Sequence, residues 1–162
     1  MITKVQKKEI INDLSKIIKE SKSVVFVNFH NISVAEETAM RKALRISGVG
    51  YVVAKKTLAK IAMGSGSISG VLPELEKELA LAYGEDLITP AREVFSFQKK
   101  YKDNVSIMGG IFDGKYMSRE EMSSIALIPS KEGLYGMFVN IINSPIQRFV
   151  IALGQIANAK TA

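Results

Sequence analysis

The chain has 162 residues, no cysteine and one histidine, His30, which excludes disulfides, thiolate metal sites and histidine-rich metal clusters. Its net charge of +6 is unevenly distributed, because twelve of the 22 Lys and Arg but only five of the 16 Asp and Glu lie at positions 1–62. That segment therefore carries +7 and the remaining residues −1, and a positive field at one end of a chain favours a polyanionic partner.

The first half of the chain is predicted to alternate between helices and strands. Its opening, MITKVQKKEIINDL, has charges where a secretory signal would be apolar, so we expect a cytoplasmic protein. Ser33 and Glu36 form a capping box at the start of the second helix, and Gly48 and Gly50 end that helix. The predicted helices lie at 3–22, 34–47 and 56–63, and the predicted strands at 23–29 and 51–55.

The next part of the chain continues the pattern after the loop GSGSISG and the helical or irregular VLPELEKE. A strand is predicted at 79–83 and a helix from Pro90 to about Tyr101, with Thr89 as its cap. The Asp113-Gly114 pair predicts a hairpin at 105–117, and Ser118 with Glu121 repeats the capping box. We expect an α+β sandwich of ferredoxin-like type, with a mixed sheet, followed by a C-terminal helical arm.

The candidate catalytic features have simpler structural explanations. GSGSISG lacks the Gly-Lys-Ser/Thr ending of a phosphate loop and fits a linker. The pairs Glu36-Glu37 and Glu120-Glu121 lie in first turns of helices, where carboxylates complement exposed N–H groups. His30 stands at a strand end with no nucleophile or orienting acid in view. We therefore expect no enzyme, no metal and no cofactor.

The segment AKKTLAK is the clearest candidate for contact with a polyanion. Lys55, Lys56 and Thr57 come where a strand passes into a helix, and Lys60 follows one turn after Lys56. Ammonium groups, a hydroxyl and the unpaired N–H groups of a helix start are typical of a phosphate-binding site. A threonine cap with solvated lysines is the alternative.

A long apolar stripe characterises the arm, residues 130–162. Ser130 is predicted to cap a helix that Ser144-Pro145 breaks or kinks, and FVNII at 138–142 is echoed eleven residues later by FVIAL at 149–153. A membrane span is disfavoured by Arg148 and by several Asn and Gln residues. The stripe could fold back on the body, but docking into a partner's groove fits better. The repeat predicts two docking events.

Four segments resemble the family of bacterial large-subunit ribosomal protein L ten, the base of the ribosomal stalk. They are VNFHNISVAEETAMRKALR, YVVAKKTLAKIA, GGIFDGK and LIPSKEGLYGMFVNIINSPIQRFVIALGQIA, and the match covers nearly the whole chain. The resemblance implies a globular domain, residues 1–129, that binds large-subunit rRNA beside ribosomal protein L eleven. It also implies that the arm, kinked at Ser144-Pro145, anchors acidic stalk-protein dimers of the L seven/L twelve type, which support translation-factor recruitment.

The basic segment and the resemblance together give two sets of expected site residues. Those expected to bind rRNA are Lys7, Lys8, Arg41, Lys42, Arg45, Lys55, Lys56, Thr57 and Lys60. Those expected to bind stalk dimers are Leu134, Phe138, Val139, Ile142, Ile146, Phe149, Val150, Leu153 and Ile156. The alternative function is a free-standing RNA-binding translational regulator whose terminal helices pack on its own core.

Overall fold

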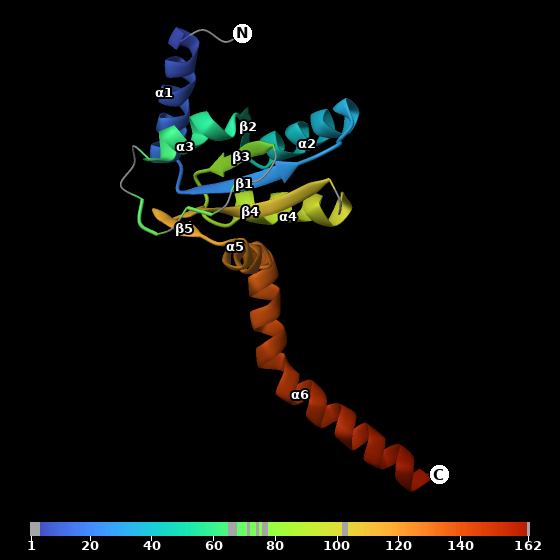
Figure 1. Ribbon diagram of the computed structural model, residues 1–162. Coiled ribbons are helices and arrows are strands. Elements are labelled where there is room, and N and C mark those ends of the chain that lie inside the picture. Colours follow the sequence, from blue (N-terminus) through green and yellow to red (C-terminus); the bar gives the residue numbers. More distant parts are fainter. Residues whose placement is uncertain are drawn as a thin grey trace. The chain divides into compact units, whose positions relative to one another are not determined.

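The computed structural model describes residues 4–64, 68–70, 72, 73, 75, 78–101 and 104–161. Helices and strands alternate along them (Figure 1). The helices are α1 (Lys4–Glu20), α2 (Val34–Ile46), α3 (Lys56–Gly64), α4 (Thr89–Lys100), α5 (Arg119–Ala126) and α6 (Lys131–Thr161). The strands are β1 (Ser23–Phe29), β2 (Gly50–Ala54), β3 (Leu79–Gly84), β4 (Val105–Phe112) and β5 (Lys115–Met117). The chain divides into two compact units, Met1–Ile128 and Pro129–Ala162.

The strands form one sheet in the order β2-β3-β1-β4-β5. Its first four strands have the ferredoxin-like order, so the predicted α+β class is confirmed. Every pair of neighbouring named strands is antiparallel, however, where a mixed sheet was predicted. The reason is topological: β1 and β2 run parallel but β3 lies between them, and β3 and β4 run parallel but β1 lies between them.

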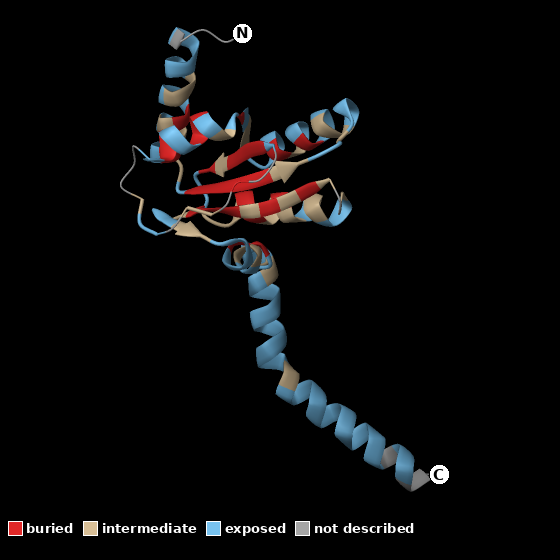
Figure 2. Ribbon diagram, viewed as in Figure 1, coloured by how far each residue is buried: buried red, intermediate tan, exposed pale blue. Residues whose placement is uncertain are grey.

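Helices cover both faces of the sheet. The helices α2, α4 and α5 pack on one face, and α1 and α3 pack on the other. Alternate side chains of β1 enter the two cores, as expected for a strand buried on both sides. The first core includes Val25, Val27, Met40, Leu44, Val94, Ile107 and Met122, and the second Leu14, Val24, Phe26, Met63, Leu81 and Ile111. Figure 2 shows this buried centre in red.

Local sequence signals set several of the element ends. Both predicted capping boxes form: the Ser33 and Ser118 hydroxyls accept from the N–H groups of Glu36 and Glu121, whose carboxylates accept hydrogen bonds in return. The predicted hairpin also forms, with positive φ angles of 48° and 75° at Asp113 and Gly114. The expectations for the loop at 64–70 and for VLPELEKE fall partly outside the described residues.

The start of α4 differs from the prediction. Thr89 is the first residue of the helix and does not cap it. Instead, the Asp86 carboxylate accepts hydrogen bonds from both the N–H and the hydroxyl of Thr89. These hydrogen bonds lower the pKa of Asp86, the hydroxyl bond having the larger effect. The hydrogen-bond acceptor at the start of α4 is therefore the Asp86 carboxylate and not the Thr89 hydroxyl.

The second unit consists mainly of α6. Ser130 begins it as predicted, because the Ser130 hydroxyl accepts a hydrogen bond of 3.3 Å from the N–H of Gly133. The helix continues through Ser144-Pro145, so it is not broken there, and Figure 1 shows it bending along its length. Proline lacks an N–H and its ring crowds the carbonyl four residues earlier, which bends a helix without ending it.

Candidate nucleic-acid interface and docking helix

The residues expected to bind rRNA lie in both helical layers of the first unit. Lys7 and Lys8 are exposed on α1, which packs against α3. The set on α2, Arg41, Lys42 and Arg45, is exposed in the opposite layer. Around the start of α3, Lys55, Thr57 and Lys60 are exposed and Lys56 is half-buried. The structure therefore does not gather all nine residues at one point.

Edge strand β2 connects the two layers. It pairs with β3 on one side and is the last strand of the sheet on the other. The chain enters β2 from α2 and leaves it toward α3, so the basic residues of these helices lie near opposite ends of the strand. A strand of five residues spans about 17 Å. The sheet edge with its two basic ends is the candidate interface.

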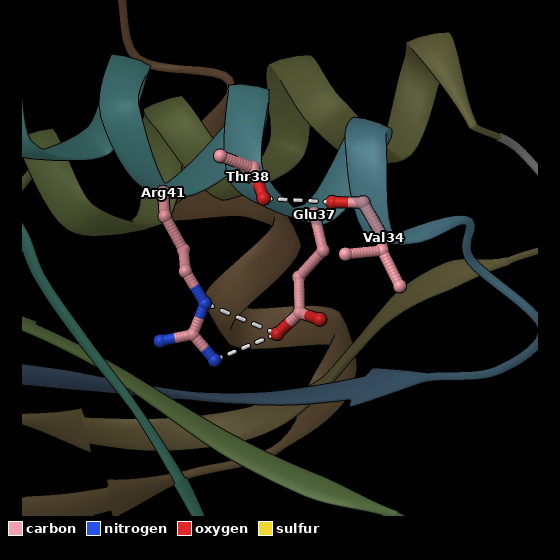
Figure 3. Close-up of polar contacts among 4 residues, drawn as sticks. All are labelled: Val34, Glu37, Thr38 and Arg41. Atoms are coloured by element: carbon pink, nitrogen blue, oxygen red, sulfur yellow. Dashed lines mark hydrogen bonds and ion pairs between the residues drawn. The ribbon is translucent and has the colours of Figure 1, made fainter.

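A hollow of about 400 Å³, which we name the arginine hollow, lies at the start of β2. Arg41 lies over the Tyr51 ring, with 4.9 Å between the guanidinium carbon and the ring centroid. Its Nη2 is 2.6 Å from the Glu37 carboxylate, and Figure 3 shows this pairing on α2. Burial raises the pKa of Tyr51 to about 12, so its hydroxyl is protonated at neutral pH. The lining residues are Arg41, Arg45, Gly48, Val49, Gly50, Tyr51 and Tyr83.

A second, larger hollow of about 650 Å³, the lysine hollow, lies at the end of β2. It brings together Lys55, Lys56 and Thr57 of the predicted phosphate site, whereas Lys60 does not line it. The Lys55 carbonyl accepts hydrogen bonds of 3.0 Å from the N–H groups of Leu58 and Ala59, as at a regular helix start. Its other lining residues are largely apolar: Ile10, Phe29, Val53, Ala54, Leu58, Glu78 and Leu79.

The docking residues expected on the arm share one face of α6. At 3.6 residues per turn, the nine fall within a sector of about 160°, and we name them the apolar stripe. All nine side chains are exposed, and Phe138 and Phe149, equivalent in the repeat, are 63% and 65% exposed. Figure 2 shows α6 almost wholly exposed. The stripe consists of Leu134, Phe138, Val139, Ile142, Ile146, Phe149, Val150, Leu153 and Ile156.

The opposite face of α6 is mostly small and polar, although it also carries the exposed Ile151. It carries Gly136, Asn140, Asn143, Gln147, Gly154 and Asn158. In the part of the chain that the structure describes, α6 is the one helix long and apolar enough to cross a membrane by length and composition. An amphipathic docking helix passes the same test, and Arg148 near the middle of this segment opposes insertion.

Comparisons with known proteins place the chain in a family. The family model for ribosomal protein L10 matches residues 2–99. The chain belongs to the ribosomal protein L10 family. It is 40% identical over 160 residues to large ribosomal subunit protein uL10 of Fusobacterium nucleatum, covering 95% of this chain and 94% of the relative. The uL10 proteins of Shouchella clausii and Lactobacillus johnsonii are 32% and 33% identical, covering 96% of this chain and 93% and 95% of those proteins.

Membership in the L10 family confirms the predicted resemblance and makes the chain a structural protein of the large ribosomal subunit, not an enzyme. The pairwise matches extend over nearly the whole chain, whereas the family model ends within α4. The pairwise relatives therefore extend over both compact units, and the family model covers most of the first. Within the described residues, no group of three acidic, His or Cys side chains could hold a metal ion.

Sequence reasoning missed the aromatic side of this L10 protein's candidate interface. Tyr51 and Tyr83 line the arginine hollow, but 32 positions separate them along the chain. β2 pairs with β3, which places Tyr83 opposite Gly50 and Tyr51 opposite Ala82, so the two tyrosines border the hollow from opposite faces of the sheet. Two glycines close together, Gly48 and Gly50, were the available signal of an open surface. The sequence interpretation took both glycines as the end of a helix and did not connect them with a site.

Proposed function

We propose that this L10 protein forms the base of the large-subunit stalk. In this proposal the first unit binds large-subunit rRNA beside ribosomal protein L eleven, and α6 anchors acidic L seven/L twelve-type dimers that support translation-factor recruitment. The observation that carries the proposal is the apolar stripe, which is exposed along its whole length. Such a stripe on a helix fits a hydrophobic groove of a protein partner.

The proposed rRNA surface is the edge of the sheet at β2 with the basic residues at its two ends. Phosphate contacts from Lys and Arg supply most of the affinity of such surfaces and make it fall with salt. The lysine hollow places Lys55 and Lys56 next to the helix start of α3. Lys7 and Lys8 belong to α1, which packs against α3, so they extend the same layer.

A salt titration tests this surface. Log affinity for cognate rRNA should fall linearly with log salt, and Lys55→Ala or Lys56→Ala should each reduce the slope by about one unit. Arg92→Ala is the matched control, because Arg92 lies on α4 and pairs with Glu93 at 3.6 Å. Unchanged affinity and slope in the Lys55→Ala/Lys56→Ala double variant would place the RNA site elsewhere.

The proposed number of dimers is two, one for each copy of the repeat. Native mass measurement of the full chain with its cognate acidic stalk protein should give two dimers per chain. Phe138→Asp and Phe149→Asp should each remove one dimer, because a carboxylate in an apolar groove has neither water nor a partner. A complex with three dimers, or loss of both dimers from one substitution, contradicts two independent sites. A free-standing translational regulator would bind no dimers at all.

A further inference from the structure

Arg148 is the one charged residue of the chain between Glu132 and Lys160. Its side chain is exposed on α6 and makes no ion pair with any residue that the structure describes. The folded chain therefore leaves this guanidinium without a counter-ion, in a segment that is otherwise apolar or uncharged.

Arg148 lies beside the apolar stripe. It immediately precedes Phe149, and at 3.6 residues per turn it lies about 40° outside the edge of the stripe at Leu134. A partner that covers the second half of the stripe therefore passes close to the guanidinium. Arg148 also borders an open hollow of about 430 Å³, which leaves room for a side chain of that partner. The other lining residues of this hollow are Asn140, Ile141, Ser144 and Pro145.

The two copies of the repeat differ at this position. Met137 stands eleven residues before Arg148 and lies within about 20° of the same direction around the helix. Its apolar side chain is 52% exposed. Phe138 and Phe149 are equivalent in the repeat, but the first is bordered by a thioether and the second by a cation.

A cation at the edge of an apolar contact restricts which partner can dock. Covering Arg148 removes part of its water, which costs free energy unless the partner supplies an anion. A carboxylate at that place adds a modest amount of affinity and disfavours partners that lack it. RNA and anionic membranes fit this site less well, because they bind surfaces that carry several Lys and Arg.

We propose that the two docking surfaces of α6 are not equivalent: the second, at 146–153, pairs Arg148 with a carboxylate of the docked acidic dimer, and the first, at 134–142, docks through apolar contacts alone. This inference rests on the proposed docking of two dimers and adds a charge requirement to one of them. Two identical dimers present the same carboxylate, which meets Arg148 at the second surface and Met137 at the first. Salt should therefore weaken the second surface more than the first.

The test titrates cognate stalk dimers into the full chain at about 50 and 500 mM salt, which spans the change from weak to strong screening. In native mass measurements of the wild type, rising salt should release one dimer before the other. Phe138→Asp keeps only the second surface and Phe149→Asp only the first. Between the two salt concentrations, affinity should fall about threefold more in Phe138→Asp than in Phe149→Asp.

Substitutions at Arg148 and Met137 assign this difference. In the Phe138→Asp background, Arg148→Gln should weaken binding about threefold at low salt and remove the additional salt dependence, whereas Arg148→Lys should keep it. The matched control Gln147→Arg/Arg148→Gln keeps the composition and net charge but turns the cation about 100° around the helix, away from the stripe, so it should behave like Arg148→Gln. In the Phe149→Asp background, Met137→Arg should give the first surface the salt dependence of the second.

The outcomes distinguish this inference from the proposed function. Equal salt dependence of the two surfaces, or unchanged affinity in Arg148→Gln, overturns the inference while docking of two dimers stands. If Arg148→Gln weakens binding to cognate rRNA or to phosphatidylserine vesicles and leaves dimer binding unchanged, Arg148 serves that partner and the inference is also overturned. The wild-type titration needs no substitution, so it decides even if one Phe→Asp variant binds no dimer. Failure of the wild type to bind any dimer overturns both proposals.

Discussion

The apolar stripe predicts a docking energy that can be worked out for Phe149. Full burial of a Phe side chain is worth about 1.5 to 3 kcal/mol. Phe149 is 65% exposed, so a partner can cover at most two thirds of its surface, which gives about 1 to 2 kcal/mol. Phe149→Ala should therefore weaken binding of a stalk dimer by about 5- to 30-fold.

Isothermal titration of the full chain with stalk-protein dimers measures this loss. Alanine is a better helix former than phenylalanine, so α6 should keep its helical content, which circular dichroism checks. Ile151→Ala is the matched control, since Ile151 is 58% exposed but lies about 160° around the helix from Phe149. Equal loss of affinity in the two variants would show that docking does not depend on the apolar stripe.

Three further predictions concern the body. A chain stopped after Pro129 keeps both core clusters and should fold and bind rRNA without stalk protein, whereas a molten product would show that the arm belongs to the core. Gly110→Ala should lower the free energy of unfolding in urea by about 1 to 3 kcal/mol, because its Cβ would lie 2.5 Å from the Val24 carbonyl oxygen. In the control Gly64→Ala the new Cβ meets no atom within 4 Å, so the free energy of unfolding should hardly change. Hydrogen bonds from Ser33 and Ser118 lower the pKa values of Glu36 and Glu121 in the folded state. The stability that these carboxylates contribute is therefore present above their unfolded-state pKa and is lost as the pH falls through their folded-state pKa. Acidification should lower the melting temperature more in the wild type than in the Glu36→Gln/Glu121→Gln variant.

Local signals predicted the elements well because each acts within a few residues. Ser33 lies three positions before Glu36, and Asp113 is adjacent to Gly114, so the cap and the turn were both visible in the sequence. Thr89 was misjudged through an equally local competitor, Asp86, whose charge makes it the better acceptor. Such errors shift an element boundary by a residue and leave the fold unchanged.

Strand neighbours could not be predicted, because they depend on segments far apart. β1 lies between β3 and β4, and each of these pairings joins residues more than 50 positions distant. The sequence likewise does not show why residue 110 is a glycine, which becomes clear only in the fold: a Cβ there would lie 2.3 Å from Cε of Met122 on α5. The tyrosines of the arginine hollow were missed for this reason, whereas its arginines were among the residues expected from the basic segment and the family resemblance.

Pro145 bears on the proposal that α6 anchors two dimers. The repeat places Phe138 and Phe149 on opposite sides of this proline along the helix, and the helix is continuous between them. A straight continuous stripe would suit one long partner helix as well as two short ones. Because proline bends the axis between the copies, the two halves of the stripe do not lie along one line, and a single straight helix cannot follow both. The bend therefore favours two separate dimers. The arm supports this as one bent helix and not as the two separate helices that a break at Ser144-Pro145 would have given.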